Sequence, residues 1–471
     1  VKSVKQEPVS TFSIDVDTAS YAFVRRTLEN GALPRRDAVR VEEMINYFSY
    51  DYPRPQNAET PFRPSIALYP SPWNKDTLLM HVGIKGHDIV TDEKPRSNLV
   101  FLIDVSGSMQ SKDKLPLLKS AFRLLVNRLD PKDTVAIVTY AGRAGTVLEP
   151  TKVSDKHKIL SALDRLRSGG STAGAAGIRQ AYALAQSGFD RQGINRVILA
   201  TDGDFNVGIS DVDELKRYIE KKRKSGVFLS VLGFGQGNYN DHLMQVLAQN
   251  GNGNAAYIDN LREAQKVLVE EAGSTLFPIA KDVKIQIEFN PALVREYRLV
   301  GYETRALKRE DFNNDRVDAG DIGSGHTVTA IYELTPVGSP AQLADELRYQ
   351  KAETETQSEV RADDAPATEY AFLKLRYKRP KENKSNLLTV PVTKELVRAS
   401  VKDLSDDMRF AAAVAAFAQK LRDVPQVEDF SYDAILELAL SARGKDRFGY
   451  RGEFLTLVRL AKSLAASQNP Q

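Results

Sequence analysis

The sequence predicts an α/β protein in which a doubly wound, mostly parallel sheet is combined with a β-sandwich and with helical segments at both ends. Three observations support this prediction. Between residues 98 and 273, short apolar runs alternate with amphipathic helical periods, a pattern typical of a parallel sheet covered on both faces. After residue 282, runs of alternating polarity follow one another without helices, as in a β-sandwich. Residues 17–47 and 407–465 show apolar spacings of three and four, the period of a helix.

Length and composition limit the classes of function. The chain has 471 residues, enough for two to four domains at about 100–200 residues each. It carries 65 Lys and Arg against 62 Asp and Glu, a net charge of +3, which is too balanced to indicate a nucleic-acid partner. Cysteine is absent, which excludes disulfide scaffolds, thiolate metal sites and cysteine nucleophiles. No apolar run reaches the roughly 18 residues of a membrane span.

The N-terminal part is expected to be helical over residues 1–57. Asp17 and Thr18 are expected to cap a helix whose apolar positions are three and four apart, and a second helix is expected at about residues 36–47. Strands are expected within residues 58–96, at 65–69 and 78–84. They have no obvious partners in the α/β block, so we expect them to pair with strands after residue 282.

That pairing would make the α/β block, residues 97–275, an insertion within one β-domain that ends near residue 400. The alternative is an independent N-terminal module. Residues 338–368 are polar and rich in charge, which favours a helical excursion or a mobile insert. Residues 401–471 are expected to form a helical C-terminal segment, with helices at 407–422, 431–443 and 453–465.

Oxygen-bearing side chains follow the strands of the α/β block. The first strand ends in Asp104, and Ser106 and Ser108 follow it two residues apart. Thr172 lies in a glycine-rich loop, and Asp202 ends a later strand. Because ligands bind at the carboxyl ends of such strands, these side chains are expected to converge. An all-oxygen set with two carboxylates suits Mg²⁺ first, with Mn²⁺ or Ca²⁺ as alternatives. We expect Ser106, Ser108 and Thr172 to bind the ion directly, and Asp104 and Asp202 to bind it directly or through water.

This arrangement resembles the metal-ion-dependent adhesion site (MIDAS) of the von Willebrand factor type A (VWA) domain, a Rossmann-like fold, over residues 98–273. The flanking stretches TFSIDVDTASYAFVRRTLENGALP and YAFLKLRYK are similar to bacterial VWA proteins of the YfbK type. The resemblance implies a protein-binding module rather than an enzyme, with an Asp or Glu of a protein partner completing the metal shell. It also implies a periplasmic or cell-surface location, with a lipid anchor attached upstream of Val1 as a membrane tether.

A second candidate metal site has the spacing of a calcium loop, with Asp-x-Asn-x-Asp at its start. Arg316 stands where such a loop has glycine, and Ile322 where it has its last acidic ligand. The alternative is a polar turn between strands. The candidate ligands are Asp311, Asn313, Asp315, Asp318 and Asp321.

The sequence alone leaves two other functions open. The chain could be the metal-binding subunit of an ATP-driven chaperone or assembly complex whose motor is another protein, because no ATP-binding motif occurs here. A metal-assisted hydrolase is the other alternative, with Asp204 as its candidate base.

Overall fold

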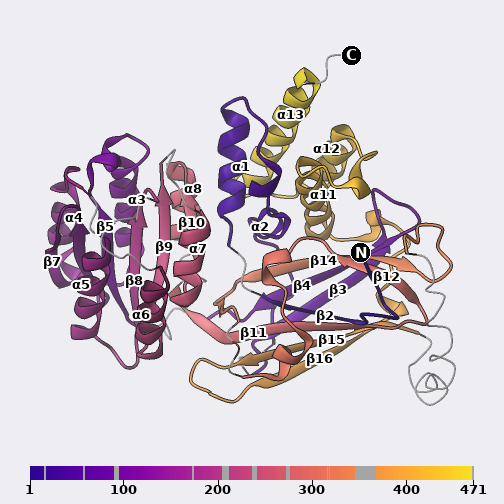
Figure 1. Ribbon diagram of the computed structural model, residues 1–471, viewed down its shortest axis with the longest axis horizontal. Helices are drawn as coiled ribbons and strands as arrows, with labels where there is room; N and C mark the ends of the chain where they lie inside the picture. The colour runs from indigo at the N-terminus through magenta and orange to yellow at the C-terminus, as the bar shows by residue number, and fades with distance from the viewer. Residues whose placement is uncertain are drawn as a thin grey trace.

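The computed structural model describes residues 1–14, 17–56, 59–89, 95–171, 174–203, 212–235, 241–271, 276–315, 317, 319–344 and 368–468. Figure 1 shows an α/β domain on one side, a β-sandwich on the other, and a group of helices from both ends of the chain above the sandwich, with α1 beside the α/β domain.

The α/β domain is built on a six-stranded sheet in the order β10-β9-β8-β5-β6-β7. All neighbouring pairs are parallel except β6 and β7, which are antiparallel. The doubly wound sheet predicted from the sequence is therefore confirmed. Its strands are β5 (Ser97–Asp104), β6 (Thr134–Tyr140), β7 (Ala144–Lys152), β8 (Ile194–Thr201), β9 (Val227–Phe234) and β10 (Ala255–Ile258).

Helices cover both faces of this sheet because successive strand residues point to opposite faces. Leu99 and Phe101 pack on one face with α3 and α4, where the rings of Phe101 and Phe122 stack with centroids 4.2 Å apart. Val100 and Leu102 pack on the other face with α5, α6 and α7. The helices are α3 (Leu115–Arg128), α4 (Lys156–Asp164), α5 (Gly174–Ser187), α6 (Val212–Lys224), α7 (Asp241–Asn250) and α8 (Leu261–Gln265), which continues as a π-helix over Lys266–Glu270.

The β-sandwich has two sheets. One has the order β1-β12-β14-β4-β3, and in the other β11 pairs with β13, β15 and β2, and β15 pairs with β16. A shared core that includes Val82, Ile285, Tyr332 and Leu373 lies between them. The strands are β1 (Lys2–Ser3), β2 (Val9–Ser13), β3 (Phe62–Pro70), β4 (Leu78–Gly86), β11 (Pro278–Phe289), β12 (Val294–Leu299), β13 (Ile322–Gly323), β14 (Thr327–Pro336), β15 (Glu369–Lys378) and β16 (Asn386–Thr393).

The α/β domain interrupts this sandwich. β4 precedes the domain in sequence and pairs antiparallel with β14, which follows it. β3 and β4 therefore lie beside later strands, and Figure 1 shows the two purple strands among orange ones. This is the pairing that the sequence favoured over an independent N-terminal module.

The N-terminal segment, residues 1–57, contains a strand that was not expected in a helical segment. β2 joins the sandwich against β11, and Phe12 is buried in the sandwich core. Such a short strand, whose partner lies more than 270 residues later, has too little local pattern to be recognised. The expected helix over residues 36–47 is divided into a short 3-10 helix, Arg36–Ala38, and α2 (Val41–Asn46).

The capping expected from Asp17 and Thr18 is also wrong. Thr18 precedes α1 (Ala19–Glu29) but makes no side-chain hydrogen bond to it. Asp17 is buried and instead accepts a hydrogen bond from the backbone N–H of Ala255 at 2.9 Å. It also forms an ion pair with Arg305 at 2.8 Å. Asp17 therefore joins the α/β domain to the sandwich.

The C-terminal helices are α11 (Asp406–Leu421), α12 (Tyr432–Ser441) and α13 (Tyr450–Gln468), close to their predicted positions. The Ala-rich middle of α11 is fully buried, because α1, α2, α12 and α13 pack around it in one core. Ser405 and Ser431 accept hydrogen bonds from the first turns of α11 and α12, as helix caps do. Short 3-10 helices lie at Gly107–Gln110, Val153–Asp155, Glu303–Arg305, Arg309–Asn313, Lys394–Leu396, Val401–Asp403 and Pro425–Val427.

Most of the polar stretch at 338–368 lies outside the described residues, since 345–367 are not described. None of the helices in the described ranges combines the length and apolar character that a membrane crossing requires.

Candidate functional site

Asp104, Ser106 and Ser108 lie together at the carboxyl edge of the α/β sheet. Ser106 Oγ lies 3.0 Å from Ser108 Oγ, so the two hydroxyls face one another across the turn at Gly107. Asp104 is buried at the end of β5, whereas Ser108 is exposed. The arrangement therefore places two buried groups, the Asp104 carboxylate and Ser106, next to the Ser108 hydroxyl, which solvent can reach.

The Asp104 carboxylate is held by one neighbour in the turn after β5 and by one at the end of β8. Its Oδ1 accepts a hydrogen bond from the Ser106 backbone N–H at 2.8 Å, and its Oδ2 accepts one from Thr201 Oγ1 at 3.3 Å. Burial raises the pKa of Asp104 to about 6, against the opposing effect of the Ser106 hydrogen bonds. A cation that comes close to such a buried carboxylate stabilises its ionised form.

Asp202 follows β8, the strand that pairs with β5, and is also buried. Its Oδ2 lies 2.8 Å from the ammonium nitrogen of Lys114. Lys114 comes directly before α3, and sequence reasoning did not include it among the site residues. Its position six residues after Ser108 does not indicate a contact with Asp202, because its side chain reaches the site only through the packing of α3 on the sheet.

The glycine-rich loop lies against the serine turn. The Gly107 N–H donates to the carbonyl oxygen of Gly170 at 3.0 Å, and the Gly169 N–H donates to that of Val105 at 2.8 Å. Thr172 lies two residues beyond this contact but outside the described residues, as does Asp204. The structure thus brings Asp104, Ser106, Ser108 and Asp202 to one edge and describes the loop up to the residue before Thr172.

These residues fit a hard divalent cation. All donors are carboxylate or hydroxyl oxygens, the ligands that Mg²⁺ and Ca²⁺ prefer. Within the described ranges, no group of three or more His, Cys, Asp or Glu side chains is placed to hold a metal. A site here would therefore depend on its hydroxyls and would keep coordination positions for water or for an incoming carboxylate.

Comparisons with known proteins cover most of the chain. Family models match at residues 1–81 (von Willebrand factor), 98–270 (von Willebrand factor type A domain) and 274–464 (Uncharacterized protein YfbK, C-terminal). "Uncharacterized protein YfbK" of Escherichia coli (strain K12) is 48% identical over 467 residues, which cover 98% of this chain and 79% of that protein. The chain belongs to the YfbK family of VWA proteins. VWA domains commonly mediate protein interactions.

More distant similarities are found over parts of the YfbK-type chain and in solved structures. "Uncharacterized protein sll0103" of Synechocystis sp. is 28% identical over 194 residues, 41% of this chain and 44% of that protein. The solved structure "von Willebrand factor type A from Catenulispora acidiphila" is 15% identical and covers 86% of this chain and 91% of that one, with a TM-score of 0.44.

Four of the five residues of the second candidate metal site are described, and each of them makes a contact within the chain. The Asp315 carboxylate accepts hydrogen bonds from Ser385 at 2.5 Å and from Arg376 at 3.3 Å. Asp311 accepts a hydrogen bond from the Lys308 N–H, and Asp321 accepts one from Asn252. Asn313 accepts a hydrogen bond from Arg376, and Asp318 lies outside the described residues. These contacts among the described residues fit the polar turn that the sequence left as the alternative, and they give no support to a calcium site.

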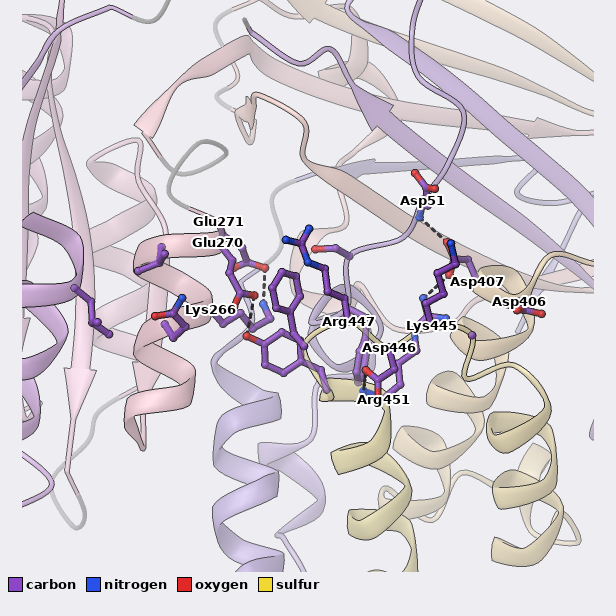
Figure 2. Close-up of a pocket in the computed structure, with 18 of the residues that line it drawn as sticks. Asp51, Lys266, Glu270, Glu271, Asp406, Asp407, Lys445, Asp446, Arg447 and Arg451 are labelled. Atoms are coloured by element: carbon purple, nitrogen blue, oxygen red, sulfur yellow. Dashed lines mark hydrogen bonds and ion pairs between the residues drawn. The ribbon is translucent and has the colours of Figure 1, made fainter. Parts of the chain in front are cut away.

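A cleft of about 1030 Å³ lies between the VWA domain of this YfbK-type protein and the helices of the N- and C-terminal segments (Figure 2). Several of the charged residues that line it are paired within the chain. Lys266 Nζ lies 2.5 Å from Glu271 Oε1, Tyr450 OH donates to Glu270 at 2.8 Å, and Arg451 pairs with Asp407. Because residues of both signs of charge line the cleft, it does not indicate the charge of a ligand. It lies at the far end of α3 from Lys114, about 20 Å away at 1.5 Å per residue.

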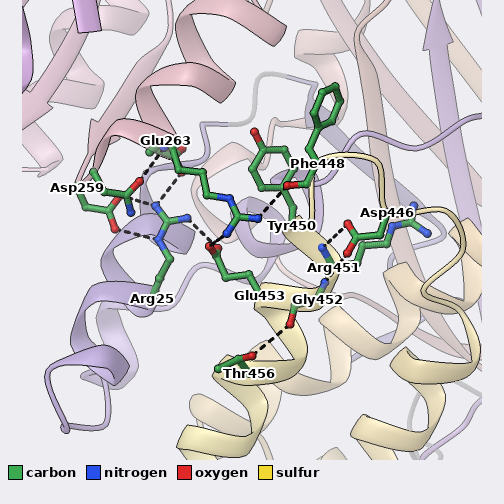
Figure 3. Close-up of polar contacts among 12 residues, drawn as sticks. Arg25, Asp259, Glu263, Asp446, Phe448, Tyr450, Arg451, Gly452, Glu453 and Thr456 are labelled. Atoms are coloured by element: carbon green, nitrogen blue, oxygen red, sulfur yellow. Dashed lines mark hydrogen bonds and ion pairs between the residues drawn. The ribbon is translucent and has the colours of Figure 1, made fainter. Parts of the chain in front are cut away.

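The last helix of the VWA domain is fixed to the terminal helices by the buried guanidinium of Arg25 (Figure 3). Arg25 on α1 contacts Asp259 after β10 through both carboxylate oxygens, with Nε 2.9 Å from Oδ2. It also reaches Glu263 on α8 at 2.8 Å and Glu453 on α13 at 3.0 Å. One side chain thus connects the VWA domain to helices from both ends of the chain.

Proposed function

We propose that this protein is a metal-dependent protein-binding module of the bacterial cell envelope, of the adhesion or scaffold type, and not an enzyme. Mg²⁺, or alternatively Mn²⁺ or Ca²⁺, would be held by Asp104, Ser106, Ser108, Thr172 and Asp202. When bound, the ion would supply a Lewis-acidic position that accepts the carboxylate of an Asp or Glu from a protein partner.

The observation that carries this proposal is the pair of serine hydroxyls 3.0 Å apart above the buried Asp104. Ser108 is exposed, so a carboxylate on another protein can approach the hydroxyl side of the site. The serine and threonine hydroxyls that would bind the ion directly carry no charge, so the ion would keep much of its positive charge at its open coordination position. An additional anionic ligand is therefore favoured.

The proposals of an envelope location and a lipid tether rest on what the resemblance of the chain to the YfbK type implies. Fractionation of the native host would test the location, with recovery in the cytosol as the result that contradicts it. Recovery there would favour the alternative of a subunit in an ATP-driven assembly.

Replacing Asp104 by Ala is expected to weaken Mg²⁺ binding by at least about 100-fold. Loss of an outer-shell partner alone weakens a metal by about 10–100-fold, and Asp104 lies at the centre of the site. Isothermal titration of Mg²⁺ into the purified chain measures the effect. Asp213→Ala, which removes an exposed carboxylate on α6, is the matched control and should bind as wild type does.

The partner is tested by affinity capture from envelope extract in Mg²⁺, in EDTA, and in Mg²⁺ with Asp104→Ala. A protein retained by wild type in Mg²⁺ alone, and lost when its own acidic residue is replaced, is the expected result. Equal capture in all three conditions would contradict the proposal, because binding would then use another surface.

A further inference from the structure

The Lys114 ammonium lies against Asp202, one of the two carboxylates expected to hold the cation. Its nitrogen is 2.8 Å from Asp202 Oδ2, and the two side chains are 10% and 0% exposed. An exposed lysine could turn away into solvent at little cost, whereas this one is enclosed with its carboxylate. The pair is therefore part of the site rather than a surface contact.

The backbone just after β9 leaves the space that the Lys114 side chain occupies. Gly235 has a φ of +79°, and a Cβ at this position would lie 2.3 Å from both Cγ and Cε of Lys114. A side chain at residue 235 would therefore displace the lysine. The Gly235 carbonyl also accepts a hydrogen bond from Tyr257 OH at 2.7 Å, which holds this part of the backbone in place.

Lys114 and a divalent ion compete for the carboxylate of Asp202. Asp104 and Asp202 give the site two negative charges, and Lys114 neutralises one of them. A divalent ion that approaches Asp202 meets a carboxylate already paired, together with a positive charge at contact distance. Like charges that close repel strongly where water is excluded, so the presence of Lys114 must weaken the binding of the ion.

We propose that Lys114 is the internal counter-ion of the metal site: it neutralises Asp202 in the metal-free protein and lowers the affinity of the site for Mg²⁺. This inference rests on the proposed function, since it assumes that the site binds a divalent ion. Lys114 would thereby set the concentration of free Mg²⁺ at which the site binds the ion. The chain can fold with Asp202 satisfied before metal arrives, and the site fills where free Mg²⁺ is high.

Lys114→Met is expected to bind Mg²⁺ at least about tenfold more tightly than wild type. Isothermal titration measures this affinity. Lys112→Met is the matched control, because it removes the same charge from an exposed position two residues away and should stay within about twofold of wild type. Lys114→Gln keeps a hydrogen-bond donor without the charge. It decides the question if Lys114→Met does not fold, and it should also bind more tightly.

Thermal unfolding supplies a second measurement. Without metal, Lys114→Met should melt at a lower temperature than wild type, because the buried Asp202 carboxylate loses the ammonium group that lies 2.8 Å from it. Mg²⁺ should raise the melting temperature of this variant by more than it raises that of wild type. Equal or weaker Mg²⁺ binding by both Lys114 variants would overturn the inference and leave the metal site intact. An equal gain in Lys112→Met would also overturn it, since the effect would then be one of net charge. Absence of Mg²⁺ binding in wild type and in every variant would instead overturn the proposed function.

Discussion

Replacing Arg25 by Met is expected to lower the free energy of unfolding by about 3–5 kcal/mol, the cost of removing one partner from a buried ionic network. The Arg25 side chain is 1% exposed, and those of Asp259 and Glu263 are 3% and 1% exposed. Without the guanidinium, both carboxylates stay buried close to each other with no positive partner between them. The variant must then hold two unpaired charges or bind protons to neutralise them.

Urea unfolding followed by the fluorescence of Trp73, the single tryptophan, measures this loss. Trp73 packs against the core of the terminal helices. Arg36→Met, which breaks an exposed pair with Asp423, is the control and should change little, as exposed pairs do. Adding Asp259→Asn to Arg25→Met should restore part of the stability. A loss no larger than that of Arg36→Met would show that the buried network contributes little.

The metal-site residues that the sequence revealed are close together in the chain or end a strand. Asp104, Ser106 and Ser108 lie within five residues, and Asp202 follows a strand whose apolar pattern is plain. Each of these can be placed from local pattern and from the rule that parallel strands end at one edge. Lys114 could not be placed this way. Its contact with Asp202 depends on how α3 packs and on Gly235, more than 100 residues later.

The same distinction holds for the fold. The alternation of strands and helices between residues 98 and 273 is a local signal repeated many times, so it predicted the α/β sheet and its coverage by helices. β2 has five residues, and it is defined as a strand by its pairing with β11 and by the burial of Phe12 in the sandwich core. Asp17 has the residue type and position of a helix cap, yet Arg305 and the N–H of Ala255 compete for its carboxylate and prevail. Contacts between distant segments decide these positions, and a local pattern does not contain them.

Acid is expected to destabilise the sandwich through His81, by about 1.4 kcal/mol for each pH unit below about 6.5. His81 is fully buried on β4, and burial lowers its pKa to about 3. Its Nε2 lies 2.7 Å from Tyr52 OH, whereas Nδ1 has no hydrogen-bond partner in the described part of the chain. The folded protein therefore holds His81 neutral at a pH where the unfolded chain protonates it. A depressed pKa gives stability that is complete above the unfolded value and is lost as the pH falls toward the folded one.

His81→Gln should remove this dependence, because glutamine does not titrate. Unfolding free energies from Trp73 fluorescence at pH 7, 6 and 5 should fall less steeply for the variant than for wild type, whatever the cost of the substitution at pH 7. His157→Gln, which removes an exposed histidine on α4, is the control and should keep the wild-type slope. His326, whose pKa burial lowers to about 4, should account for much of the acid sensitivity left in His81→Gln. Parallel slopes for wild type and His81→Gln would contradict the argument, since they would mean that the folded sandwich accepts a proton at His81 as readily as the unfolded chain does.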